Sequence, residues 1–207
     1  MKHRKRMKAI PDVPGQFEAY GRGQQPPCKK GKERVTRMPL ANADEQPERI
    51  KELLERPGTL DVLRLIANAP NVFEEWARMA GELFDSPTFT PRMREVIILR
   101  VGHLQESPYE LAQHVVFARK AGLTDQQIDA LQDKATLDDA GFGADERLVI
   151  DTVTELCTTR RLSDGSFAQA HKLLGDEALT EMLMIVSCYY GLALVLNAVD
   201  LDIDAPA

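Results

Sequence analysis

From residue 45 onward, apolar residues recur at intervals of three and four, which is the period of a helix that buries one face. No alternating apolar and polar run of useful length, which would predict a β-strand, occurs between residues 45 and 200. Pro57-Gly58, Pro70 and Gly175-Asp176 interrupt the helical pattern. The pattern therefore predicts an all-α domain over residues 45–207, with about eight helices joined by short connections.

Local signals predict several helix ends. Thr90-Pro91 places an N-cap residue before a proline at the first helical position, and that helix is predicted to continue to about Leu104. Ser107-Pro-Tyr-Glu110 has the spacing of a capping box and predicts a helix that Gly122 ends. A second capping box, Thr124-Asp-Gln-Gln127, predicts a short helix. Further helices are predicted near 50–54, 60–67, 72–84 and 145–160, and on either side of the break at 175–176.

The last predicted helix could be read as a membrane span. Residues 182–199 carry no formal charge, and 18 such residues reach the lower limit for crossing a bilayer. Glu181 and Asp200 flank this stretch, however, and no lysine or arginine anchors either end. We therefore predict a buried helix in a bundle or a subunit interface, and no membrane partner.

Charge divides the chain of 207 residues into two parts. Residues 1–37 hold 11 of the 26 Lys and Arg residues and 3 of the 32 Asp and Glu residues. The rest of the chain therefore holds 15 basic and 29 acidic residues. An acidic body with a net charge of −14 repels phosphate backbones, so a nucleic acid partner is not expected.

Residues 1–44 are predicted to be a disordered basic leader, because Pro and Gly recur in a stretch without an apolar period. The leader could be a solvated tail, a misassigned start with Met38 as the true one, a polyanion-binding arm or a targeting peptide. It lacks the apolar core of a secretory signal.

Only three cysteines occur, at no short spacing, which excludes a disulfide scaffold or cysteine-rich zinc site and favours a cytoplasmic location.

Candidate chemistry lies between residues 90 and 122. His114 follows Glu110 by four residues, about 40° around a helix, so both point to one apolar face. Such a couple suits general acid–base chemistry, although the carboxylate could instead cap its helix and the imidazole could be a core histidine. Glu95 and Arg100 are polar residues in the apolar helix before it. They could form structural ion pairs, or Arg100 could hold a substrate carboxylate.

The segment TPRMREVIILRVGHLQESPYELAQHVVFARKAGLTDQQIDAL, residues 90–131, resembles the carboxymuconolactone decarboxylase family, which includes the alkylhydroperoxidase D-like proteins. This resemblance implies a helical bundle of the alkylhydroperoxidase D-like fold, assembled as a homo-oligomer, usually a trimer or hexamer.

The resemblance also implies site residues. In the peroxidase branch of the family, a CxxC pair precedes a histidine, and a glutamate lies nineteen residues before that histidine. Here His114 and Glu95 match, but the two cysteine positions are Ser107 and Glu110. Without those sulfurs, the usual thiol peroxidase chemistry has no residues to perform it. Members of the decarboxylase branch have a sequence similar to P-x-E-L-x-x-H at this point, and residues 108–114 match it.

The resemblance therefore implies a cofactor-independent lyase or isomerase that acts on a small carboxylated, lactone-like metabolite by proton transfer. Glu110, His114 and Glu95 are the expected catalytic residues, and Arg100, Ser107 and Tyr109 the expected substrate-binding residues. An arginine of a neighbouring chain could hold the substrate carboxylate in place of Arg100. No metal or cofactor is expected. The alternatives are an alkylhydroperoxidase-type antioxidant activity and a non-catalytic helical oligomer or ligand-binding protein.

Overall fold

The computed structural model describes residues 36–204, which form helices and connections without a strand, as predicted. The short 3-10 helices are η1 (Ala43–Glu45), η2 (Lys134–Thr136) and η3 (Asp138–Ala140). The longer elements are α1 (Glu48–Leu54), α2 (Asp61–Ile66), α3 (Pro70–Phe84), α4 (Pro91–Leu104), α5 (Pro108–Lys120), α6 (Asp125–Ala130), α7 (Ala144–Thr159) and α8 (Asp164–Val199).

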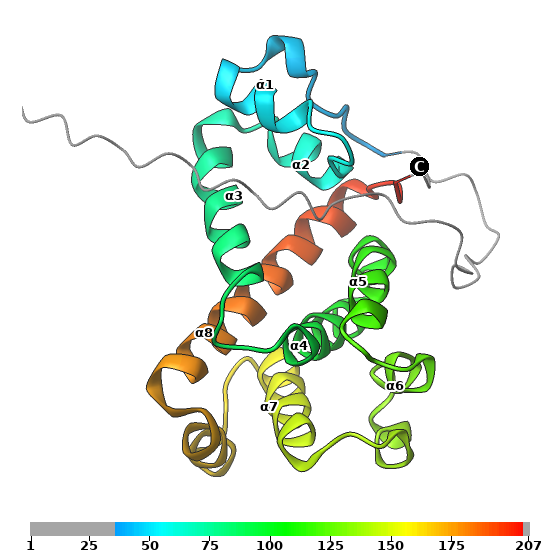
Figure 1. The fold of residues 1–207 in the computed structure, drawn as a ribbon, viewed down its shortest axis with the longest axis vertical. Helices are drawn as coiled ribbons and strands as arrows, with labels where there is room; N and C mark the ends of the chain where they lie inside the picture. Colours follow the sequence, from blue (N-terminus) through cyan, green and yellow to red (C-terminus); the bar gives the residue numbers. More distant parts are fainter. Residues whose placement is uncertain (1–35, 205–207) are drawn as a thin grey trace, which may run out of the picture.

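Helix α8 runs diagonally through the molecule. Helices α1–α3 lie on one side of it and α4–α7 on the other (Figure 1). Helix α4 lies at the centre of the second group and packs against α5, α7 and α8. Every residue from Glu95 to Gly102 is buried. A Cβ atom added at Gly102 would lie 3.1 Å from Leu111 Cδ2, so the missing side chain permits the close approach of α4 and α5.

Two of the predicted helix N-caps form as expected. The Thr90 hydroxyl accepts the Met93 N–H at 3.2 Å, with Pro91 as the first helical residue of α4. Thr124 and Gln127 form both hydrogen bonds of a capping box at the start of α6. These positions are confirmed because the cap depends only on residues within one turn.

Helix α8 is long and apolar enough to cross a membrane by length and composition alone, which is weak evidence for a span. It is interrupted at Gly175, whose φ of 71° is non-helical, where the sequence predicts a break. One side of its apolar half packs against α3, α4 and α7, while Met184, Leu194 and Val195 are exposed. Assembly as a homo-oligomer and a cytoplasmic location stay predictions.

Residues 36–44 fall within the predicted leader but pack against the C-terminal residues. Arg37 pairs with Asp200 at 2.6 Å, and Thr36 donates a hydrogen bond to Asp202. Ala41 is buried. The rest of the predicted leader, including the basic cluster at the start of the chain, lies outside the described residues.

Arg100 is buried on the side of α4 that faces α6 and α7. Its guanidinium donates to the carbonyl of Leu131 at 2.6 Å, to that of Gln132 at 3.3 Å and to the Thr154 hydroxyl at 2.9 Å. Its partners are therefore protein carbonyls at the end of α6 and a hydroxyl of α7. Burial lowers the pKa of Arg100, and the nearby Asp151 opposes this effect.

We expect Arg100→Met to destabilise the protein by about 2 to 4 kcal/mol, because the buried carbonyl of Leu131 and the part-buried carbonyl of Gln132 lose their donor. Urea unfolding measures this change. Arg119→Met is the control, since Arg119 pairs with Asp125 on the surface and its loss should cost under about 1 kcal/mol. Equal effects of the two substitutions would contradict the structural role of Arg100.

Candidate active site

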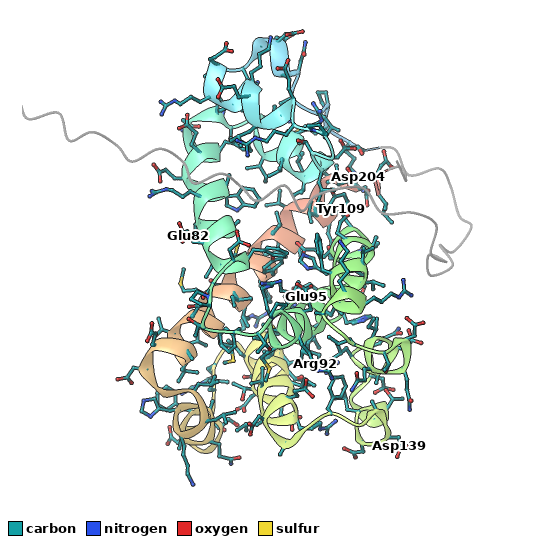
Figure 2. All side chains as sticks on the ribbon, viewed as in Figure 1. Glu82, Arg92, Glu95, Tyr109, Asp139 and Asp204 are labelled. Atoms are coloured by element: carbon teal, nitrogen blue, oxygen red, sulfur yellow. The ribbon has the colours of Figure 1, made fainter. Side chains whose placement is uncertain are left out.

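Glu95 is a fully buried carboxylate on α4, near the centre of the molecule (Figure 2). Its Oε2 lies 2.8 Å from Nδ1 of His114 on α5, and its Oε1 lies 3.2 Å from Nε of Arg94. A buried carboxylate without such partners would be costly, so these two contacts make its burial possible.

Arg94 connects this carboxylate to α3. Its guanidinium lies over the Phe84 ring, 4.0 Å from the ring centroid, and donates to the Phe84 carbonyl. Arg94 is not among the site residues that the sequence predicts. Its position directly before Glu95 was the only signal available, and adjacent helical residues do not ordinarily share a face.

His114 is held by Glu95 on one side and faces Glu110 on the other. Its Nε2 lies 4.0 Å from Glu110 Oε2, which is longer than a hydrogen bond. The imidazole also packs edge-to-face on Tyr189 of α8, with 5.0 Å between ring centroids, and lies near Phe117. Glu95 thus orients the ring through Nδ1, so that Nε2 is directed to the side of Glu110.

The predicted capping box at the start of α5 is wrong. Ser107 does occupy the N-cap position, but its side chain makes no capping hydrogen bond. The Ser107 N–H, which Glu110 would bind in a capping box, donates to the Gly102 carbonyl at 3.0 Å. The Glu110 carboxyl is therefore available elsewhere, and its buried Oε1 has no hydrogen-bond partner among the described residues.

Glu110 and His114 line a cavity of about 120 Å³. Helix α5 contributes these two residues and also Tyr109, Gln113 and Phe117 to the wall. Helix α8 contributes Cys188, Tyr189, Leu192 and Leu196. The acid and the imidazole that the sequence places on one face of a helix thus border one cavity.

The remaining wall comes from the N-terminal helices. Helix α3 lines the cavity along one face, with residues at intervals of three and four: Phe73, Trp76, Ala77, Ala80, Gly81 and Phe84. Asp85 follows them, and Leu53, Leu60, Val62 and Leu63 complete the wall. None of these residues is predicted as part of the site from the sequence, because their apolar pattern is the same as that of any core-facing helix.

The three expected substrate-binding residues have different positions. Arg100 and Ser107 are not among the residues that line the cavity. Tyr109 does line it, but its hydroxyl donates to Asp204 at 2.5 Å and accepts the Val62 N–H at 3.1 Å. Figure 2 shows Tyr109 and Asp204 close together. The tyrosine thus contributes its ring to the wall, while its hydroxyl joins α2, α5 and the C-terminal residues.

Burial and charge shift the pKa values of the central pair. Burial raises the pKa of Glu110 from 4.5 to about 7, against the opposing effect of His114. Burial alone would lower the pKa of His114, but the charge and hydrogen bond of Glu95 outweigh it and raise that pKa. The raised pKa of His114 favours its protonated form, and a pKa of about 7 leaves Glu110 divided between acid and carboxylate near neutral pH.

The cysteines are in a different state. Burial raises the pKa of both Cys157 and Cys188 to about 11, so both are protonated thiols near neutral pH. Cys188 lines the cavity, whereas Cys157 belongs to the hydrophobic core. Within residues 36–204, no group of three His, Cys, Asp or Glu side chains is arranged to hold a metal ion.

Comparison with known proteins finds a similarity over the central part of the chain. Residues 70–144 match the carboxymuconolactone decarboxylase family, a segment that includes Glu95, Glu110 and His114. No curated protein matches the chain.

Solved structures share the fold at low sequence identity. An uncharacterized peroxidase-related protein from Silicibacter sp. TM1040 superposes with a TM-score of 0.69 at 18% identity, covering 85% of this chain and 95% of that one. An uncharacterized peroxidase-related protein with an alkylhydroperoxidase AhpD core, from Ralstonia eutropha JMP134, gives 0.70 at 15% identity, with 84% and 94% covered. A putative antioxidant defence protein AhpD from Agrobacterium tumefaciens gives 0.61 at 16% identity, with 67% and 95% covered.

These structures share the helical fold of the described chain over most of their own length. Residues 70–144 of this chain are thus similar to the carboxymuconolactone decarboxylase family, and the described chain shares the helical fold of these AhpD-related structures.

Proposed function

We propose that this protein is a cofactor-independent enzyme that moves a proton to or from a carbon atom next to a carbonyl group. The observation that carries this proposal is that Glu110, a residue of the cavity wall, has a buried Oε1 without a hydrogen-bond partner among the described residues. Buried carboxyl oxygens ordinarily have partners, and one without a partner beside a cavity is available to a ligand.

Glu110 acts as the general base. Its carboxylate takes a proton from the substrate carbon, and the electrons of that C–H bond form an enolate with the negative charge on the carbonyl oxygen. His114, protonated and held by Glu95, donates a hydrogen bond from Nε2 to this oxygen. Glu110 then returns the proton to the same carbon or to another carbon of the conjugated system. A pKa of about 7 allows Glu110 to act in both directions near neutral pH.

The lyase reaction expected from the sequence uses the same groups in a different order. Loss of CO₂ from an unsaturated lactone acid leaves a dienolate, and Glu110 in its acid form protonates it. That reaction needs a cation for the substrate carboxylate, for which Arg100 was the candidate. Arg100 instead binds the carbonyls of Leu131 and Gln132. Proton transfer without decarboxylation is therefore the better-supported proposal.

One observation favours a second function, a thiol-dependent peroxidase. Cys188 lines the same cavity as Glu110, and two of the structural relatives are described as peroxidase-related. Against it, the pKa of Cys188 is about 11, and the positions of the CxxC pair hold Ser107 and Glu110.

Proton transfer is tested by deuterium exchange in D₂O with a panel of small ketones and unsaturated lactones, with and without a carboxylate, followed by proton NMR. We expect the protein to accelerate exchange at carbon next to the carbonyl. The rate should rise with pH through about 7, as Glu110 ionises to the carboxylate that acts as the base.

Glu110→Gln and His114→Ala should each lower that rate about 100-fold or more. Glu82→Gln and His171→Ala are the matched controls, since both residues are exposed and outside the cavity wall. Retained exchange in Glu110→Gln would show that the base is another group.

Glu110→Gln should also stabilise the fold in a pH-dependent manner. The folded-state pKa of Glu110 is raised, so the wild-type protein loses stability as pH rises from about 4.5 to about 7. The substituted protein lacks this ionisation. Its gain over wild type, measured by urea unfolding, should be on the order of 2 kcal/mol larger at pH 8 than at pH 4.5. A gain that is independent of pH would contradict the raised pKa.

The peroxidase alternative predicts dithiothreitol-dependent consumption of an alkyl hydroperoxide. We expect the wild-type protein to consume no more hydroperoxide than Cys188→Ser and Cys157→Ser, because neither thiol is ionised near neutral pH. Consumption that disappears in Cys188→Ser but persists in Cys157→Ser would instead establish thiol chemistry in the cavity.

A further inference from the structure

We infer that the substrate is an uncharged, largely apolar carbonyl compound, selected mainly by the aromatic and small residues of α3. This inference rests on the proposed function and names the substrate class of the same site. The cavity wall, its charges and the contributions of α3 each support it.

The wall of the cavity is apolar except at a few positions. The α3 face presents Phe73, Trp76 and Phe84, with Ala77, Ala80 and Gly81 between them. On the opposite side, Tyr189 and Leu192 of α8 continue this surface. A ligand enclosed by such residues gains free energy in proportion to the apolar area it removes from water.

The charges at the cavity do not favour an anion. Among the described residues that line it, none is lysine or arginine, while Asp85 and Glu110 are acids. His114 can supply a positive charge to this wall when it is protonated, but Glu95 lies 2.8 Å from its Nδ1 and balances that charge. Arg94 is occupied by Glu95 and the Phe84 ring. A substrate carboxylate would therefore lose its hydration without gaining an uncompensated cation.

The same charges suit a neutral carbonyl compound. The oxygen of a ketone or ester needs one hydrogen-bond donor, which Nε2 of His114 supplies, and its acidic carbon needs one base, which is Glu110. Two polar groups on an otherwise apolar wall match a ligand with one polar end.

Helix α3 determines the shape of the space. Ala80 and Gly81 lie on the face that lines the cavity, and a Cβ atom added at Gly81 meets no heavy atom within 4 Å. Larger side chains at these two positions should occupy the space that a ligand needs, without disturbing Glu110 or His114.

Binding can be measured without any reaction. Trp76 is the only tryptophan of the chain and lines the cavity, so its fluorescence reports occupancy. The probes are acetophenone, 4-acetylbenzoate and methyl 4-acetylbenzoate, which separate the effect of charge from that of size. Saturation-transfer NMR provides an independent measurement. At pH 8 we expect the two neutral probes to bind, and the carboxylate to bind about tenfold more weakly or not at all.

Two variants test the role of α3. Ala80→Phe and Gly81→Leu should each abolish binding of acetophenone, and the second keeps the test valid if the first fails to fold. Met79→Phe is the matched control, because Met79 is an exposed residue of the same helix outside the wall, and it should leave binding unchanged.

Binding of none of the three probes, equal or tighter binding of the carboxylate, or normal binding in both filled variants would overturn the inference. Failure of the proposed function has a different result. Acetophenone would then bind and respond to Ala80→Phe, but the protein would not exchange its methyl protons. That outcome supports the substrate class and rejects the proton transfer.

Discussion

The burial of the Glu95 carboxylate is the constraint on which this site depends. A charge removed from water must be compensated nearby, and here His114 and Arg94 provide the compensation from α5 and from α4 itself. Arg94 in turn stacks on Phe84 at the end of α3. One carboxylate therefore determines the orientation of the imidazole and joins the helices that form two walls of the cavity.

Glu110 differs from Glu95 although both are buried carboxyl groups. Glu95 has close partners on both oxygens, whereas Glu110 Oε1 has none among the described residues and Oε2 lies 4.0 Å from His114. Burial without compensation favours the neutral acid, which is why the pKa of Glu110 rises to about 7. An unpartnered buried carboxyl group lowers the stability of the fold. Such a group beside a cavity is a candidate for a role in chemistry.

Helix α4 carries polar groups with separate purposes on its two sides. Glu95 faces the cavity region, and Arg100 faces α6 and α7, where it donates to the carbonyls of Leu131 and Gln132. Both lie in an apolar sequence, and both are buried. Their roles differ because their neighbours differ: Glu95 contacts an imidazole and orients it, whereas Arg100 binds backbone carbonyls and stabilises the fold.

The features that could be predicted from the order of amino acids alone are those that depend on neighbours within about one helical turn. Thr90-Pro91 and Thr124–Gln127 define helix starts because the capping partners are three residues away, and Gly175 marks a break because of its backbone conformation. The four-residue spacing placed Glu110 and His114 on one face for the same reason. The family resemblance further linked Glu95 to His114.

The roles of these groups depend on how the helices pack against one another. Ser107 and Glu110 have the spacing of a capping box, but the Ser107 N–H binds the Gly102 carbonyl of the preceding helix, so Glu110 turns to the cavity. The helical period predicted that Arg100 lies in an apolar setting. It did not predict the carbonyl that Arg100 binds, because that carbonyl is more than thirty residues away in the chain. The α3 wall, Arg94 over Phe84 and Tyr189 against His114 also went unrecognised. Their contacts join segments that local spacing does not relate, so they exist only once the helices have packed.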